Sequence, residues 1–175
     1  ATITTTISTH DHDAFEKGNG TLKSEDGKLE LTKNSEEYLG FIFSGITIPN
    51  GAIINSANLI FDNKTDKSHT FILDLLGETS LVLDDFDDGV SGLISGRYGA
   101  ASGLTSEINH SLSFDCHQYD YSIDVTSIIS EIYASGTNAT TFSTGGNITI
   151  LAHADRPNSG DKFVIEDIED RKSVV

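Results

Sequence analysis

Several residue types that often define a protein's class are scarce in this sequence of 175 residues. Cys116 is the only cysteine, which excludes an internal disulfide. Trp and Met are absent, and no stretch approaches the roughly 20 consecutive apolar residues that a membrane-spanning helix needs. Residues 1–6 show neither the basic nor the apolar segment of a secretory signal peptide. We therefore expect no membrane insertion and no disulfide framework.

Basic residues are also few. The chain has 11 Lys and Arg against 27 Asp and Glu, for a formal net charge of −16. So negative a surface repels nucleic-acid phosphates and anionic lipid headgroups, which excludes both as expected partners. The partners left open are other proteins of an assembly, further copies of the chain, and glycans.

The residues that are abundant favour strands and turns. Apolar residues alternate along many short segments that are separated by Gly, Asn, Asp and Pro, which is typical of antiparallel β proteins. The turn Ile48-Pro49-Asn50-Gly51 is one such break, because Pro49 restricts φ and Gly51 permits a positive φ. We expect one domain over residues 1–175. The segments predicted as strands with one face toward a core are 29–31, 38–43, 53–62, 71–75, 147–153 and 162–168.

One helix is predicted near residue 130. Asp124 or Thr126 can cap its start, and Gly136 can end it. The predicted fold class is therefore all-β, a jelly-roll-like antiparallel β-sandwich with one short helix. The helix rests on an apolar stripe at i, i+3, i+4, i+7 and i+8, made of Val125, Ile128, Ile129, Ile132 and Tyr133.

The strand pattern stops between residues 84 and 103, where the chain is acidic and rich in Gly and Ser. A connection this long inside a compact domain is usually functional or mobile. If the chain belongs to an assembly, we expect residues 92–103 and the N-terminal segment to make its contacts. Asp84–Gly89 resembles a calcium-binding loop, but Phe86 occupies the third ligand position. We therefore interpret this part as a charged loop.

Several segments together resemble a known family. The segments 11–16 and 38–43, the turn motif 46–57 and the helix start Asp124–Ile129 resemble DNRLRE-like, carbohydrate-binding-module-like β-sandwich domains of bacterial secreted and surface proteins. This resemblance implies a jelly-roll sandwich without catalytic activity. It also implies a place beside polysaccharide-degrading domains or in surface proteins, and some relatives bind acidic glycans.

The most concentrated set of metal-ligand types lies near the N-terminus. His10-Asp11-His12-Asp13 is followed by Glu16, and hard carboxylate oxygens suit Ca²⁺. The first and last strands of a jelly roll often lie close together. The candidate ligands for Ca²⁺ are therefore Asp11, Asp13, Glu16, Asp167 and Asp170. The alternative interpretation is a solvated N-terminal strand.

A glycan site is the second candidate, because sugar faces pack on exposed aromatic rings. Tyr119 and Tyr121 share parity and would lie on one face of a strand. The alternative interpretation is that these rings pack inside the sandwich or under the long loop. The candidate ligand-binding residues are Tyr98, Tyr119, Tyr121, Arg97 and Asn109, with Asp120 as a further polar partner.

No catalytic arrangement is identified, and we expect no enzyme. Leu93 occupies the second glycine position of a nucleophile elbow, for example. Two functions stay open. The first is a structural or attachment protein on an exterior surface, such as a phage capsid decoration or tail-fibre component. The second is a carbohydrate-binding module of a secreted bacterial enzyme or adhesin. The expected location is accordingly a virion surface or the extracellular space.

Overall fold

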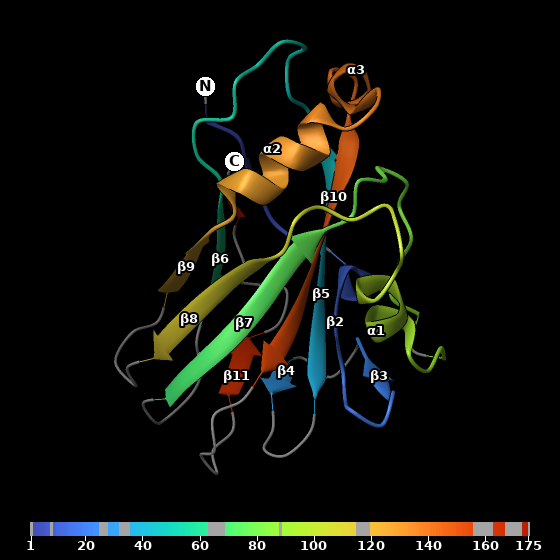
Figure 1. Cartoon of the computed structure of the whole chain (residues 1–175), viewed down its shortest axis with the longest axis vertical. Coiled ribbons are helices and arrows are strands. Elements are labelled where there is room, and N and C mark those ends of the chain that lie inside the picture. The colour runs from blue at the N-terminus through green and yellow to red at the C-terminus, as the bar shows by residue number, and fades with distance from the viewer. Residues whose placement is uncertain are drawn as a thin grey trace.

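A computed structural model gives the arrangement of the chain (Figure 1). Within the part that it describes, no helix is long and apolar enough to cross a membrane. The residues described are 2–7, 9–24, 28–31, 36–62, 69–87, 89–114, 120–155, 163–166 and 173–174.

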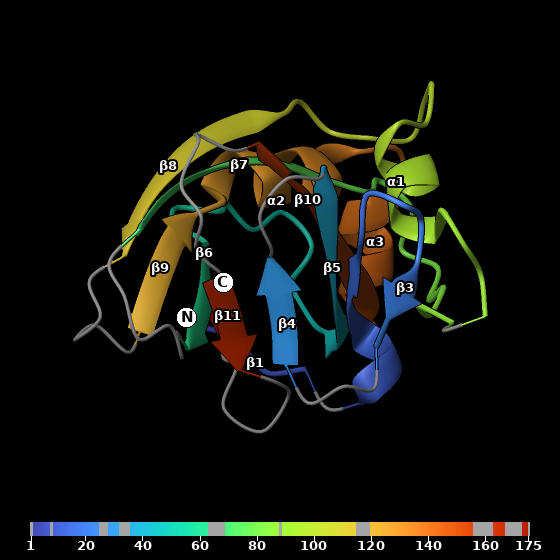
Figure 2. The ribbon, with the colours of Figure 1, turned by 90° about the horizontal axis from the view of Figure 1, so that it is seen from below.

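The larger sheet contains six antiparallel strands within these ranges. Figure 2 shows β7 and β8 at one side of this large sheet and β2 and β3 at the other. In order across the sheet, the strands are β3 (Leu22–Lys23), β2 (Asp13–Glu16), β5 (Glu37–Ile46), β10 (Gly146–Asp155), β7 (His69–Gly77) and β8 (Ile108–Phe114).

A second, smaller antiparallel sheet faces the large one. Its order is β1 (Thr4–Thr5), β12 (Ser173–Val174), β6 (Asn58–Asp62) and β9 (Asp120–Asp124). A separate ribbon pairs β4 (Lys28–Leu31) with β11 (Phe163–Glu166). These ranges confirm most of the predicted strands.

The strand pairing makes the sandwich a jelly roll. β5 pairs with β10, β6 with β9 and β7 with β8, as in one long hairpin whose tip is residues 78–107. The successive pairs lie in the large, the small and again the large sheet, so the hairpin is wound around the core. The remaining pairing of β10 with β7 closes the large sheet. The long connection noted in the sequence is therefore the tip of this hairpin.

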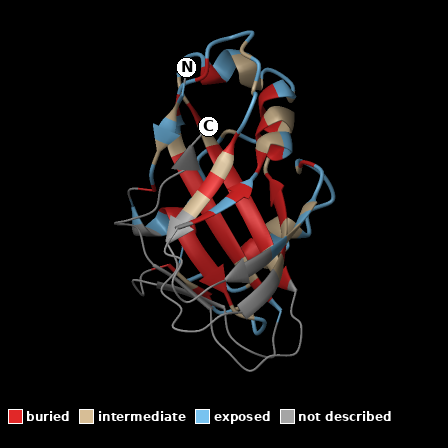
Figure 3. Cartoon of the chain, turned by 90° about the vertical axis from the view of Figure 1, so that its left-hand side faces the viewer, coloured by how far each residue is buried: buried red, intermediate tan, exposed pale blue. Residues whose placement is uncertain are grey.

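The main core lies between the sheets (Figure 3). Leu39, Phe41 and Phe43 of β5 face it, as their alternation predicts. Helix α2 (Thr126–Ala134) closes one end with the predicted apolar stripe, and the Asp124 carboxylate accepts hydrogen bonds from the Thr126 backbone N–H at 2.9 Å and from its hydroxyl at 2.5 Å. These two hydrogen bonds lower the pKa of Asp124.

Two sequence expectations about local structure are corrected. Ile53 is exposed, because the chain after the turn at Gly51 reaches the sheet only at Asn58. The single predicted helix is accompanied by α1 (Leu93–Tyr98), α3 (Asn138–Phe142) and the 3₁₀ turn η1 (His10–His12). All three are too short to show a helical apolar repeat.

Candidate ligand-binding site around helix α1

The hairpin tip folds back onto the outer face of the large sheet, where Phe86 anchors it. Phe86 is fully buried against Gly40, so close that a Cβ atom on Gly40 would lie 2.2 Å from the ring Cζ. The Phe86 backbone N–H donates to the Asp11 carbonyl at 2.8 Å. Phe86 belongs to a second apolar cluster of Ala14, Leu22, Ile42, Leu76, Ile94 and Leu151, separate from the main core.

Helix α1 lies on the same face, held by Glu16 of β2. The buried Glu16 carboxylate accepts hydrogen bonds from the backbone N–H groups of Ile94 at 2.7 Å and Ser95 at 3.2 Å. These are donors at the helix start that have no partner within the helix. Glu16 therefore fixes α1 relative to the sheet.

A row of polar and aromatic side chains crosses the outer face of the large sheet, beside the part that Phe86 and helix α1 cover. The pairing register places Glu16 opposite Tyr38, Tyr38 opposite His153, His153 opposite Asp74, and Asp74 opposite Asn109. All five point to the outer face, and we call them the outer-face row. Glu16 is buried, whereas the other four are half-buried or exposed and span roughly 14 Å at the usual strand spacing.

Tyr98 of α1 completes an aromatic cluster on this row. The Tyr38 and His153 rings are stacked with centroids 4.8 Å apart, and Tyr98 lies 5.5 Å from Tyr38 and 5.8 Å from His153. Two further contacts involve Asp74, whose carboxylate accepts from the Asn109 side chain at 2.6 Å and whose other oxygen lies 4.0 Å from His153 Nδ1. Aromatic faces and hydrogen-bonding groups thus lie side by side.

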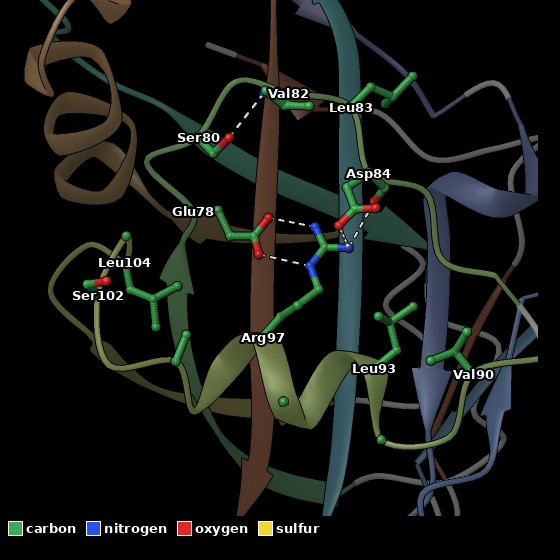
Figure 4. A pocket seen from close by; sticks show the side chains of 14 residues that line it. Glu78, Ser80, Val82, Leu83, Asp84, Val90, Leu93, Arg97, Ser102 and Leu104 are labelled. Carbon is green, nitrogen blue, oxygen red and sulfur yellow. Dashed lines mark hydrogen bonds and ion pairs between the residues drawn. The ribbon is translucent and has the colours of Figure 1, made fainter.

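On the other side of α1, Arg97 lies at the base of an open groove (Figure 4). Its guanidinium donates to both oxygens of Glu78, at 2.8 and 2.5 Å, and to the Asp84 backbone oxygen at 2.8 Å. It also lies over the Phe86 ring, 4.8 Å from the centroid. Because its donors are occupied by Glu78 and Asp84, Arg97 connects helix α1 to the loop 78–84 and stabilises that loop.

Alkaline pH should weaken this region through Tyr98. Burial, and then the hydrogen bond to Glu107, raise the pKa of Tyr98 above its usual range. Because folding favours the protonated phenol, that stabilisation is present below about pH 10, where an unfolded tyrosine ionises, and is lost at higher pH. We expect Tyr98→Phe to lose about 1 kcal/mol at pH 7, from the missing hydrogen bond.

The measurement is urea unfolding at pH 7 and at several pH values above 10. The free energy of unfolding should fall less steeply with pH in Tyr98→Phe than in the unmodified chain. Equal slopes would contradict a role for the Tyr98 hydroxyl.

The structure brings together two of the residues predicted to bind a ligand, Tyr98 and Asn109. They meet at Asp74, where the Tyr98 hydroxyl donates to the backbone oxygen at 3.3 Å and the Asn109 side chain donates to the carboxylate at 2.6 Å. Arg97 is separated from them, because it lines the groove on the other side of α1. The prediction for Tyr121 is wrong. Its side chain lies on the inner face of β9, so the ring packs in the main core and is only 5% exposed. Tyr119 and the Asp120 side chain lie outside the described residues.

The predicted calcium ligands are not brought together where they are described. Asp13 and Glu16 are three positions apart on β2, so they point to opposite faces of the sheet, and Asp11 is exposed on η1. In the described ranges, no group of three or more His, Cys, Asp or Glu side chains could hold a metal ion. Asp167 and Asp170 lie outside these ranges, and their part in a calcium site stays a prediction.

Sequence reasoning missed Tyr38, Asp74 and His153. A usable signal was present in β5, where Tyr38, Gly40 and Ile42 alternate with the core residues. Apolar residues on both faces of a strand indicate that its second face is also covered or used. The partner positions on β7 and β10 depend on register, which single strands do not reveal.

Comparisons with known proteins leave the family open. No protein-family model matches the sequence, and no curated protein matches it. The DNRLRE-like assignment therefore stays a prediction. A family 11 carbohydrate-binding module from Clostridium thermocellum, solved in complex with a β-1,3-1,4-mixed-linked tetrasaccharide, is similar with a TM-score of 0.38 and 12% identity. The match covers 97% of this chain and 94% of that one, and similarity this low identifies neither family nor ligand.

Proposed function

We propose that this chain is a non-catalytic carbohydrate-binding module whose glycan lies along the outer-face row beside Tyr98. The observation that carries the proposal is the strand register. It aligns Tyr38, His153, Asp74 and Asn109 on the outer face of the large sheet, where their side chains are half-buried or exposed. Sugar rings have apolar faces that pack on aromatic rings, and their hydroxyl groups bind carboxylates and amides.

The charges of the site favour a neutral glycan. Asp74 and Glu107 supply carboxylates, whereas Arg97, the basic residue of α1, is held by Glu78 on the other side of the helix. Hydroxyl groups of a neutral sugar can donate to Asp74. A uronate polymer would meet like charge, and it would need a bridging cation such as Ca²⁺.

Affinity electrophoresis tests the proposal. The panel consists of neutral polysaccharides (mixed-linkage β-glucan, xylan and galactomannan) and acidic ones (alginate and pectin), each with and without Ca²⁺. We expect retardation by a neutral polysaccharide without Ca²⁺. Tyr38→Ala should then weaken the binding roughly tenfold, because a ring contact of about 1 kcal/mol or more is lost.

Two variants serve as comparisons, and circular dichroism checks that each folds. Ile53→Ala changes an exposed side chain outside the row and should leave binding unchanged. Binding that is lost in Tyr119→Ala and retained in Tyr38→Ala would move the site away from the row. Failure of every polysaccharide to retard the chain would reject a carbohydrate-binding function.

The other functional expectation, a structural or attachment protein such as a phage capsid or fibre component, gains no specific support from the fold or the comparisons. It stays a prediction. The proposed glycan function is compatible with an extracellular location, where polysaccharides are encountered, and this location is likewise a proposal.

A further inference from the structure

Exposed apolar side chains gather at the groove on the Arg97 side of α1. Within the described residues, four large hydrophobic side chains are exposed, and three of them line this groove: Val82 at 72%, and Leu83 and Val90 at 45% each. Scattered exposed apolar residues are ordinary, whereas a cluster that is rimmed by charge marks a contact surface. None of these three residues belongs to the outer-face row.

The groove has the size and shape for a short peptide segment. Its volume is about 680 Å³, and it opens between the loop 78–84, helix α1 and residues 100–104. Figure 4 shows Val82 and Leu83 on one wall and Leu93 and Val90 on the opposite side, with Arg97 and Glu78 between them. The walls can therefore contact an apolar side chain from two sides.

The walls are held in place without a partner. The Thr79 backbone N–H donates to the Gly103 carbonyl at 2.8 Å, Glu78 holds Arg97, and Phe86 fixes the loop to the sheet. A groove that is already formed loses less conformational entropy when a partner binds. These contacts hold the exposed apolar side chains in position when no partner is bound.

The charge around the groove determines what kind of segment fits. Residues 78–104 contain five acidic residues and one basic residue, Arg97, whose donors face Glu78 and Asp84. Asp84, Asp85 and Asp87 are exposed, and Asp84 lines the groove with one carboxylate oxygen 4.0 Å from the Arg97 guanidinium. The Asp85 carboxylate lies 3.2 Å from His12 Nε2. A matching partner therefore has apolar side chains flanked by Lys or Arg. A second copy of this chain, with its net charge of −16, is repelled.

We infer that this groove is a docking site for a protein segment that carries apolar side chains flanked by basic residues. The segment places its apolar side chains between Val82, Leu83 and Val90, and its cations next to Asp84 at the edge of the groove. The site is distinct from the outer-face row and does not depend on glycan binding.

Peptide titration of the ¹⁵N-labelled full chain tests this inference. The probe is acetyl-Lys-Leu-Leu-Lys-amide, and the matched controls are acetyl-Glu-Leu-Leu-Glu-amide and acetyl-Lys-Ser-Ser-Lys-amide. We expect saturable amide shifts at Val82, Leu83 and Val90 with the probe, and at least tenfold weaker binding of either control. The double variant Val82→Ser/Leu83→Ser should weaken probe binding at least tenfold, whereas Ile53→Ser should not.

Four results would overturn the inference. Equal binding of the Lys-Ser peptide would mean that charge alone attracts the probe, and equal binding of the Glu-Leu peptide would mean that the acidic rim has no role. Absence of saturable shifts would show that the groove does not bind such segments. Sedimentation of the chain alone is the remaining test, because self-association that is lost in the double variant would assign the groove to a second copy.

Discussion

Replacing Phe86 by alanine should lower the free energy of unfolding by about 3–5 kcal/mol, the usual cost of removing a fully buried phenylalanine. This is a large part of the total stability of an ordinary domain, which is about 5–15 kcal/mol. The size of the effect is unusual for a residue within a long acidic loop.

The reason lies in what surrounds the ring. Phe86 fills the space over Gly40, contacts the second apolar cluster and lies beneath the Arg97 guanidinium. Alanine would leave a cavity that the neighbouring strands cannot close, because β2, β5 and β10 are fixed by their own pairing. The loop would also lose its attachment, and the groove wall at Val82 and Leu83 would lose its position.

Urea unfolding followed by far-ultraviolet circular dichroism measures the loss, and Val82→Ala provides the matched control. Val82 lies on the same loop with its side chain exposed, so its replacement should change stability by less than about 0.5 kcal/mol. If both variants lost the same small amount, the loop would not be anchored through Phe86.

The main core was predictable because its residues follow simple periodicities. Leu39, Phe41 and Phe43 alternate with a period of two, and the stripe of α2 has the helical repeat. Each pattern needs only local sequence. Strand order and register depend on pairing between distant segments, and for this reason the outer-face row could not be derived from the alternation of any one strand.

The alternation of residues along a strand also could not decide which of its two faces is exposed. Tyr121 was a reasonable candidate for a glycan platform, but the face of β9 on which it lies is the inner one. Asp13 and Glu16 were grouped by their nearness in sequence, although an odd spacing on one strand separates them. In Asp84–Gly89 the feature that argued against calcium, Phe86, is the residue that anchors the loop.

Gly40→Ala is the second substitution with a large expected effect, about 3 kcal/mol. The added Cβ would lie 2.2 Å from Phe86 Cζ and 2.7 Å from both Cε atoms, distances that no native packing tolerates. Strand β5 is paired on both sides, so the ring must leave its site. The same unfolding experiment measures this loss.

Gly96→Ala is the control for Gly40→Ala. A Cβ at Gly96 would meet nothing within 4 Å, and alanine favours a helix more than glycine does by about 1 kcal/mol, so this variant should be neutral or more stable. A loss in Gly96→Ala as large as that in Gly40→Ala would mean that the close approach to Phe86 is not the cause.

A double-mutant cycle separates the clash from any other effect at Gly40. Without the Phe86 ring, the new methyl group has space, so Gly40→Ala should cost less than about 1 kcal/mol in the Phe86→Ala background. The sum of the two single losses in unfolding free energy would then exceed the loss of the double variant by about 2 kcal/mol. Strictly additive losses would show that Gly40 and Phe86 act independently. Contact with the Phe86 ring would then not be the reason why glycine is required at position 40.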